Sequence, residues 1–385
     1  MQQKANTLKS LFIEKFDSSP LMVKSPGRIN LIGEHTDYNM GYALPAAIDM
    51  AVYVAIQKND TNECKMIALD LEEAYEFSVG ESLKPCDVAW ANYFFGVIQE
   101  FSDRGVDIGG FDMIFTSDIP SGAGLSSSAA LESSFGLALS ELFSANFPLK
   151  EIARIGQAAE HKFAGVKCGI MDQVASCLGK KDHVMLLDCE SQEHLYISSG
   201  LSDYQLVLFD THVKHNLADS QYNIRRKQCE TGVKALQEKY SQTTSLRHAT
   251  LDQLYEVQNE MDAVIYDGCK YIIEENERVL QACNALKQGD IKALGTLLFE
   301  SHEGLSNLYE VSCVELDALV ALANANEHIL GARMMGGGFG GCTINLIKTE
   351  HKEEVIAQIL HQYQVHTQQT ATAYSVQISN GAMKI

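Results

Sequence analysis

A run of glycines and serines at residues 120–131 is the strongest chemical signal in the sequence. It reads PSGAGLSSSAAL and lies between a strand-like segment at 111–116 and a helix-like segment at 126–143. Glycines let the backbone approach an anion closely, and a helix N-terminus adds unpaired N–H groups with a partial positive charge. The run therefore predicts a phosphate-binding loop. The alternative is a tight turn with a serine N-cap, although a cap needs only one of the three serines.

A second run, at residues 26–38, is dense in polar side chains. It reads PGRINLIGEHTDY, with Arg, Asn, Glu, His, Asp and Tyr around two glycines. Carboxylates accept hydrogen bonds from sugar hydroxyls, and an arginine can bind an anionic group. The run therefore suits a polyhydroxylated ligand. Taken alone, it fits an N-capped turn with a surface ion pair equally well.

Two acidic residues, Glu160 and Asp172, form a third candidate. They lie twelve positions apart, and the segment CGIMDQ surrounds the second. One carboxylate could hold Mg²⁺ while the other orients a nucleophile. Two solvated acids are the simpler interpretation of these residues alone.

The fourth candidate is GARMMGGGFGGC at residues 331–342, with five glycines in the six positions 336–341. Such a segment is not the interior of a helix or strand, because the loss of backbone entropy is too large. It predicts a loop that approaches a ligand or another backbone closely, or else a flexible bend.

The remaining chain must supply the elements that position these segments. The pattern of apolar residues predicts strands at 50–56, 111–115, 204–210, 342–347 and 373–378. It predicts a helix at 126–143 and mostly helical structure at 219–239, 252–288 and 291–327. Strands and helices are mixed without a regular βαβ alternation, which favours an α+β fold over a doubly wound sheet. A polar stretch at 198–203 predicts a boundary near 195–205, and hence domains at 1–200 and 201–385.

Composition narrows the classes of function. The chain has 385 residues, of which 46% are hydrophobic and 21% charged, as in a folded soluble protein. Its 50 acidic and 30 basic residues give a net charge of −20, which disfavours nucleic-acid and anionic-membrane partners. Ten cysteines include no CxxC pair, the opening MQQKAN has no apolar signal region, and no run approaches the roughly 18 apolar residues of a membrane span. We therefore expect a protein of the reducing cytoplasm.

Together, the four segments resemble the galactokinase family of the GHMP kinase superfamily. GRINLIGEHTDY at 27–38 is similar to the galactokinase signature, GAGLSSSA at 122–129 to the superfamily phosphate loop, and 331–342 to the third superfamily motif. The resemblance covers nearly the whole chain and extends to Lys214, His215, Tyr222, Arg225, Arg226, Ser301, His302 and residues 315–317. The sequence departs from the family pattern at Met40 and Gly304, where the family has no directly catalytic residue.

The resemblance implies a two-domain GHMP kinase fold. The N-terminal domain would resemble domain 2 of ribosomal protein S5, the C-terminal domain would be ferredoxin-like, and the active site would lie between them. The implied reaction is transfer of the γ-phosphate of ATP to the anomeric hydroxyl of α-D-galactose, which gives galactose 1-phosphate and ADP at the entry to galactose catabolism. We expect a monomer whose partners are the two small-molecule substrates.

Motif matching also implies roles for individual residues. Arg28 and Asp172 would be catalytic and flank the anomeric hydroxyl, and Ser128 and Glu160 would ligate Mg²⁺. The residues implied to contact the sugar are Glu34, His35, Thr36, Asp37, Gly169, Asp172 and Tyr222. Those implied to wrap the triphosphate of ATP are Gly122, Ala123, Gly124, Leu125, Ser126, Ser127 and Ser128.

Physical chemistry is compatible with these roles. A sugar hydroxyl is a poor nucleophile, and help from a general base is worth about 10²–10⁴ in rate. An arginine beside a carboxylate weakens it as a base, and a loose phosphoryl-transfer transition state depends mainly on positioning and charge neutralisation. We therefore expect Asp172 to orient the hydroxyl and take its proton late, and Arg28 to stabilise charge on the transferring group. Mg²⁺ keeps several waters, so two protein oxygens suffice.

Two other functions stay open at this point. One is a kinase for a related sugar, such as N-acetylgalactosamine, arabinose or galacturonate. The other is a non-catalytic sensor that binds galactose and ATP and regulates transcription through a partner. The intact segment 126–130, together with Glu160 and Asp172, favours an enzyme over a sensor.

Overall fold

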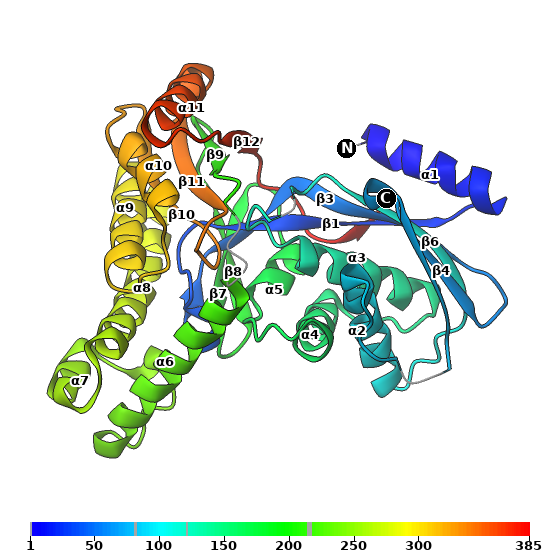
Figure 1. Cartoon of the computed structure of the whole chain (residues 1–385), viewed down its shortest axis with the longest axis horizontal. Coiled ribbons are helices and arrows are strands. Elements are labelled where there is room, and N and C mark those ends of the chain that lie inside the picture. Colours follow the sequence, from blue (N-terminus) through cyan, green and yellow to red (C-terminus); the bar gives the residue numbers. More distant parts are fainter. Residues whose placement is uncertain (1, 81–82, 121, 214–217) are drawn as a thin grey trace.

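The computed structural model describes residues 2–80, 83–120, 122–213 and 218–385. Lys214 and His215, which the family resemblance singled out, lie outside the described residues, as does Ser121 of the glycine–serine run. The two halves of the chain meet along the middle of the molecule, with the first half around a long sheet and the second half around three long helices (Figure 1).

The first half is built on a six-stranded sheet with the order β13-β1-β3-β6-β4-β5. Its strands are β1 (Leu21–Asn30), β3 (Pro45–Lys58), β4 (Glu63–Ala68), β5 (Glu73–Ser78), β6 (Phe111–Ser117) and β13 (Met383–Lys384). Strands β4 and β6 run parallel, whereas the other neighbours are antiparallel. The short β13 comes from the far end of the chain and pairs with β1.

Helices cover both faces of this sheet (Figure 1). One face carries α2 (Ala89–Asp103), α3 (Ser127–Leu142), α4 (Leu149–Ala159) and α5 (Met171–Leu178). The other face carries α1 (Gln2–Phe16), which buries Leu8 and Phe12 against Met22 and Tyr53 of the sheet. Because both faces are covered, the central strand β3 is apolar along most of its length rather than alternating.

A small antiparallel sheet and several short turns complete the first half. The sheet has the order β2-β7-β8, with β2 (Tyr42–Ala43), β7 (His183–Asp188) and β8 (Glu193–Ser198). The short helical turns are η1 (Asp37–Asn39), η2 (Leu69–Leu71) and the π-helical η3 (Glu160–Ala164).

The second half combines a four-stranded antiparallel sheet, of order β10-β11-β9-β12, with helices. The strands are β9 (Tyr204–Asp210), β10 (Ile329–Met334), β11 (Cys342–Lys348) and β12 (Thr372–Val376). The helices and turns are α6 (Ala218–Lys239), η4 (Leu246–His248), α7 (Leu251–Glu256), η5 (Gln258–Glu260), α8 (Ala263–Gln288), α9 (Ile291–Asn307), α10 (Val314–Asn324), η6 (Thr349–His351) and α11 (Lys352–Thr367).

The predicted elements agree with this arrangement except at two breaks. The strand predicted at 204–210 is β9, and those at 342–347 and 373–378 correspond to β11 and β12. The segments 252–288 and 291–327, which were predicted to be mostly helical, are mostly helical, and each contains one break. The first is interrupted at Asp262, whose extended backbone forms the N-cap of α8, and the second at residues 308–313. In the second break the carbonyl of Val311 accepts from the Phe339 amide, so a tertiary contact replaces a helical turn.

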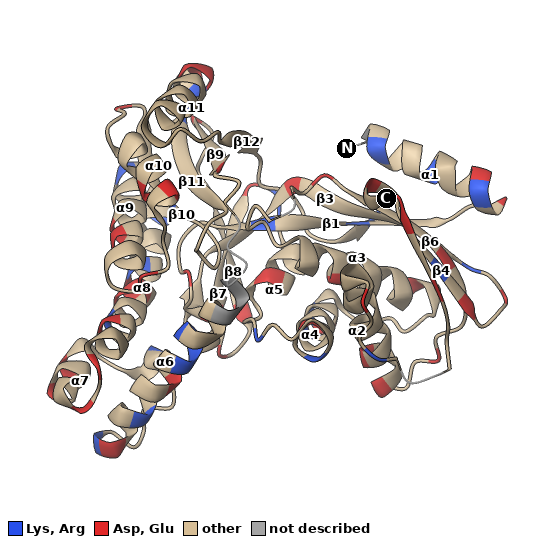
Figure 2. Ribbon diagram, in the orientation of Figure 1, with Lys and Arg blue, Asp and Glu red and all other residues tan. Residues whose placement is uncertain are grey.

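Acidic and basic residues are spread over the elements of both halves (Figure 2).

All ten cysteines are free thiols, and seven of them are buried. None of the described helices combines the length and apolar character needed to cross a membrane.

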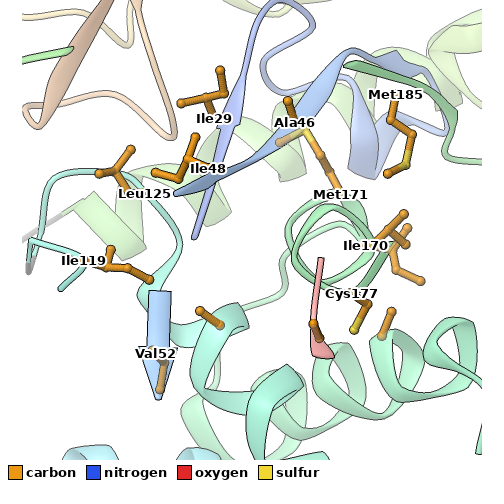
Figure 3. Packing of buried hydrophobic residues seen from close by; sticks show 14 of the residues in the cluster. Ile29, Ala46, Ile48, Val52, Ile119, Leu125, Ile170, Met171, Cys177 and Met185 are labelled. Atoms are coloured by element: carbon orange, nitrogen blue, oxygen red, sulfur yellow. The ribbon is translucent and has the colours of Figure 1, made fainter. Parts of the chain in front are cut away.

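Buried apolar residues next to the candidate site residues anchor them in the core. Ile29 follows Arg28, Leu125 precedes Ser126, and Met171 precedes Asp172; each of the three apolar side chains is at most 4% exposed. Figure 3 shows Ile29 on one strand, Leu125 on the glycine–serine run and Met171 at the start of α5, all within one cluster.

The same cluster extends into the second half of the chain. It includes Val279 and Cys283 of α8 and Ile344 of β11, together with the first-half residues. The division into domains at 1–200 and 201–385 stays a prediction.

Candidate active site

A cavity of about 410 Å³ lies between the two halves of the fold. The described residues that line it come from the segments singled out in the sequence. They are Arg28, Glu34, His35, Asp37, Tyr93, Pro120, Gly122, Gly124, Leu125, Ser126, Ser127, Ser128, Glu160, Val166, Cys168, Met171, Asp172, Tyr222, Gly336, Gly337 and Gly338. The fold thus gathers residues that are up to about three hundred positions apart in the sequence.

Arg28 and Asp172 form a two-pronged ion pair at the cavity. Arg28 Nε donates to Asp172 Oδ1 at 2.7 Å, and Nη2 donates to Oδ2 at 2.9 Å. The remaining nitrogen, Nη1, donates to the carbonyl of Gly124. Arg28 lies in β1 and Asp172 lies in the first turn of α5. The pair therefore connects a strand and a helix, and the Arg28 bond to Gly124 connects both to the glycine–serine run. A bidentate pair of this kind fixes the orientation of the carboxylate and stabilises its negative charge.

The glycine–serine run opens helix α3 as predicted, and the alternative interpretation, a turn capped by a serine side chain, is not what the structure has. Ser126 occupies the N-cap in a left-handed conformation with φ of 55°, and its side chain caps no helical amide. Its hydroxyl donates instead to Asp172 Oδ2. A contact with the neighbouring helix has therefore replaced the local cap, and it places the amides at the start of α3 at the edge of the cavity.

Two close backbone approaches hold this run in place. The Arg28 amide donates to the Leu125 carbonyl at 3.1 Å, and a Cβ on Gly27 would lie 2.7 Å from that same oxygen. On the other side the run meets the glycine loop at residues 336–341, where a Cβ on Gly336 would lie 3.6 Å from Gly124. The glycine loop therefore approaches another backbone and the cavity at the same time, as its composition predicted.

Residues 33–42 carry Glu34, His35 and Asp37 into the cavity. This segment is here called the sugar loop, because the family resemblance implies that it contacts the sugar. Glu34 Oε1 accepts from Arg333 Nη2 at 3.1 Å and from the Gly336 amide at 2.9 Å. Arg333 belongs to β10 and is fully buried, so the second half of the chain fixes this carboxylate.

His35 lies at the bottom of the cavity among aromatic rings. Its Nδ1 is 2.8 Å from the Tyr38 hydroxyl, which in turn is 2.8 Å from the Tyr309 hydroxyl. The Tyr222 ring lies 5.4 Å from the imidazole, centroid to centroid. Burial lowers the pKa of His35 to about 3, so the ring is neutral at pH 7. Its Nε2 is buried and makes no hydrogen bond of good geometry within the described part of the chain, while the Gly337 backbone lies next to the ring.

Asp37 lines the cavity, and one of its carboxylate oxygens accepts a hydrogen bond from a backbone amide. The Tyr38 amide donates to Asp37 Oδ1 at 2.9 Å. Burial, followed by the negative charge of Asp172, raises the pKa of Asp37 to about 7. Gly169 packs against this carboxylate so closely that a Cβ there would lie 1.9 Å from Oδ2, which explains the glycine.

Ser128 and Glu160 meet at another wall of the cavity. The Ser128 hydroxyl donates to Glu160 Oε1 at 3.3 Å, while Gln173 Nε2 donates to Glu160 Oε2 at 2.8 Å. Burial, followed by the charge of Asp172, raises the pKa of Glu160 to about 7. One hydroxyl and one carboxylate are hard oxygen donors, and a bound cation would stabilise the ionised form of this buried acid, so the pair fits Mg²⁺. Within the described residues no cluster of three or more His, Cys, Asp or Glu side chains could hold a metal on its own.

Comparison with known proteins places this geometry in a family. Family models match residues 10–58 as the galactokinase galactose-binding signature, residues 92–180 as the GHMP kinase N-terminal domain, and residues 282–365 as the GHMP kinase C-terminal domain. The galactokinase of Thermotoga petrophila is 42% identical over 95% of this chain and 100% of its own length. The galactokinase of Clostridium acetobutylicum is 40% identical over 94% of each chain. This chain belongs to the galactokinase family.

Solved structures agree with the membership of the galactokinase family. The galactokinase of Lactococcus lactis, crystallised with galactose, has a TM-score of 0.95 and 32% identity, with 99% of both chains covered. The mevalonate kinase of Methanococcus jannaschii, at 18% identity and a TM-score of 0.66 over 94% of this chain and 99% of its own, shares the fold. The predicted two-domain GHMP kinase fold is therefore confirmed.

Within this member of the galactokinase family, three predicted site residues do not line the cavity. Thr36 is fully buried, and its hydroxyl lies 2.9 Å from the Gly33 carbonyl and 2.6 Å from the Tyr42 carbonyl. Ala123 belongs to the glycine–serine run and is fully buried, and Gly169 packs against the Asp37 side chain. These residues support the conformation of the sugar loop and of the glycine–serine run without lining the cavity.

Sequence reasoning missed several lining residues. Tyr93, Val166 and Cys168 line the cavity but lie outside the residues assigned to the site. Tyr93 belongs to α2, where an aromatic residue at helical spacing is indistinguishable from a core residue. Gly336 and its two successors were predicted to approach a ligand, and they do line the cavity.

Proposed function

We propose that this chain is a galactokinase, which transfers the γ-phosphoryl group of ATP to the anomeric hydroxyl of α-D-galactose and releases α-D-galactose 1-phosphate and ADP. One observation carries the proposal: a single cavity holds the Arg28–Asp172 pair between the sugar loop and the glycine–serine run. In that arrangement the sugar hydroxyl, which accepts the phosphoryl group, would bind on one side of the pair. ATP, which donates the phosphoryl group, would bind on the other side. Membership of the galactokinase family supports the same reaction.

The sugar loop supplies the groups that would bind galactose. Neutral His35 would offer Nε2, which makes no hydrogen bond of good geometry to another described residue, and Glu34 would offer Oε2, because its described partners contact Oε1. Asp37 and Tyr222 line the adjoining wall. A site that hydrogen-bonds several hydroxyls of one ring penalises a sugar that misplaces one of them, because buried partners are then left unpaired.

Asp172 would orient the anomeric hydroxyl and receive its proton. Arg28 and Ser126 hold the carboxylate from two sides, so it keeps one orientation while the hydroxyl donates to it. Arg28 would also face negative charge on the transferring phosphoryl group. In a loose transition state this positioning contributes more than the strength of the base.

Residues 122–128 would wrap the triphosphate, with the amides at the start of α3 directed at phosphate oxygens. Ser128 and Glu160 would hold Mg²⁺, which supplies positive charge to neutralise the β- and γ-phosphates. We also propose that the protein is a monomer, and that the enzyme works in the cytoplasm, at the entry to galactose catabolism.

A coupled assay of ADP release tests the proposal directly. Galactose should be the preferred substrate over N-acetylgalactosamine, arabinose and glucose, which differs from galactose only at C4. The Asp172→Asn variant is the matched control, because it keeps the shape of the side chain but removes the proton acceptor. Faster turnover of N-acetylgalactosamine than of galactose would assign the chain to a related sugar kinase, and no sugar-dependent turnover would make it a sensor.

A further inference from the structure

Helix α8 holds the sugar loop from behind through three side chains. The Tyr271 hydroxyl donates to the Glu34 carbonyl at 3.1 Å, Glu275 Oε1 accepts from the Gly33 amide at 2.9 Å, and Asn276 Oδ1 accepts from the Tyr42 amide at 2.8 Å. Tyr271 and Glu275 share one face of the helix because they are four positions apart, and Asn276 follows Glu275 on the adjoining face. All three bonds reach backbone atoms, at both ends of the loop.

These three side chains are fixed within the core. Tyr271 and Glu275 are fully buried. The Glu275 carboxylate also accepts from Ser301 Oγ and from Arg278 Nε, both at 2.7 Å. Asn276 Nδ2 donates to the Ile272 carbonyl at 3.0 Å, which leaves Oδ1 as the acceptor for the loop. Each group is thus held by a second partner or by packing, so it cannot follow the loop if the loop moves.

The backbone of the loop packs directly against side chains of the helix. A Cβ on Gly41 would lie 2.3 Å from Asn276 Oδ1, and one on Gly33 would lie 2.8 Å from the Val279 side chain. Gly33 also has φ of 101°, which is strained for other residues. The two glycines therefore allow this close contact, and the shape of the loop depends on the helix face beneath it.

None of the three residues lines the cavity. Their side chains therefore cannot touch the sugar, yet they bond the backbone of Glu34, of Gly33 just before it, and of Tyr42 at the far end of the loop. A missing bond leaves a buried backbone group unpaired, which favours loop conformations in which that group reaches water. Such conformations would move Glu34 and His35 away from the sugar hydroxyls.

We propose that Tyr271, Glu275 and Asn276 are positioning residues for sugar binding, which act through the backbone of the sugar loop. The inference rests on the proposed function, in which Glu34 and His35 bind galactose. It assigns α8, which carries no residue of the cavity wall, a part in sugar affinity and none in nucleotide affinity.

The test compares four variants by galactose KM, ATP KM and thermal midpoint. Tyr271→Phe removes one hydroxyl, and Asn276→Leu removes the acceptor of the Tyr42 amide. Asn276→Asp keeps that acceptor and is the conservative rescue. Ser301→Ala is the matched control, since it removes a buried hydrogen bond to Glu275 Oε1 but none to the loop.

We expect Tyr271→Phe and Asn276→Leu to raise galactose KM by about tenfold, while ATP KM stays within about twofold of the wild type. Asn276→Asp and Ser301→Ala should keep both values within about threefold of the wild type. Tyr271→Phe changes little volume and keeps the test decisive if Asn276→Leu does not fold. The inference is overturned if Tyr271→Phe raises galactose KM no more than Ser301→Ala does, or if it raises ATP KM equally.

A fifth variant separates this inference from the proposed site. Glu34→Gln should weaken galactose binding measured by calorimetry without nucleotide. Normal binding by Glu34→Gln would refute the sugar site, and the inference would fall with it. Weak binding by Glu34→Gln together with normal galactose KM in Tyr271→Phe and Asn276→Leu would refute the role of α8 alone.

Discussion

Arg333 and Glu34 form an ion pair across the two halves of the fold in which both side chains are at most 3% exposed. Arg333 Nε also donates to the Leu31 carbonyl at 2.8 Å, and its other nitrogens reach the carbonyls of Asn30 and Met334. The guanidinium thus spreads its charge over four acceptors, and one of them is the carboxylate that we assign to galactose. Strand β10 therefore fixes a sugar ligand that the first half of the chain carries.

Removal of Arg333 should destabilise the protein strongly, because it leaves Glu34 charged and buried. We expect Arg333→Met to lower the free energy of unfolding by about 3–5 kcal/mol. The double variant Arg333→Met/Glu34→Gln should lose less than the sum of the two single variants, as residues in one ion pair are coupled. Denaturant titration of the four proteins measures this, and strictly additive losses would contradict the coupling.

Asp172→Asn should affect chemistry more than sugar binding. The variant keeps the shape of the side chain but cannot accept the proton, so we expect turnover to fall by about 10² or more. Galactose affinity by calorimetry should change by at most about tenfold, or roughly 1.4 kcal/mol. Normal turnover would show that Asp172 has no catalytic role, and loss of sugar binding would make it a binding residue.

Ser128→Ala and Glu160→Gln should raise the concentration of Mg²⁺ needed for half-maximal rate. Each variant removes one of the two protein oxygens available to the cation, and neither removes a residue of the sugar loop. Binding of Mn²⁺ with nucleotide, followed by electron paramagnetic resonance, gives a readout that is independent of turnover. Ser133→Ala, on the same helix α3, is the control; an unchanged metal requirement in both site variants would argue against this pair.

Galactose affinity should rise with pH through neutrality. The pKa of Asp37 is raised to about 7, so its carboxylate gains the charge that a sugar hydroxyl prefers only above that pH. Between about pH 6 and pH 8 we expect a gain of about tenfold, measured by calorimetry without nucleotide. Asp37→Asn should bind galactose more weakly and almost independently of pH; a variant with the wild-type pH profile would point to another group.

The raised pKa of Asp37 also predicts how the free energy of unfolding changes with pH. The folded state holds a proton on Asp37 that the unfolded chain loses near its ordinary pKa of 3.8. The contribution of this group to the free energy of unfolding therefore falls as pH rises from 3.8 to about 7. Denaturant titrations of the wild type and Asp37→Asn over this range should differ by a slope of that sign.

Local signals in the sequence were enough to find most of the cavity. The glycine–serine run, the polar run at 26–38 and the glycine loop each need unusual residue types at adjacent positions, so they are visible without the fold. The Arg28–Asp172 pairing came from family resemblance, since the two residues are far apart in sequence. The serine cap of the alternative interpretation is absent because Ser126 prefers a tertiary partner, Asp172, over its own helix.

Residues that act through long-range contacts left no such signal. The residue pattern around Tyr271 and Glu275 indicates only an amphipathic helix. Their partners in the sugar loop lie more than two hundred positions away in the sequence. Arg333 appeared within the glycine-rich segment, but its pairing with Glu34 depends on how β10 meets the sugar loop. The break near Val311 also depends on a long-range contact, since the Val311 carbonyl accepts from the Phe339 amide.

Strand β13 completes the outer edge of the six-stranded sheet by pairing Lys384 with Val23 and Met383 with Lys24. During translation, β1 leaves the ribosome long before β13, because β13 follows all the other described strands in the sequence. The nascent chain therefore presents an open strand edge at β1 until β13 emerges. Open edges pair readily with other chains, so the speed of elongation and the presence of chaperones set how long that hazard lasts.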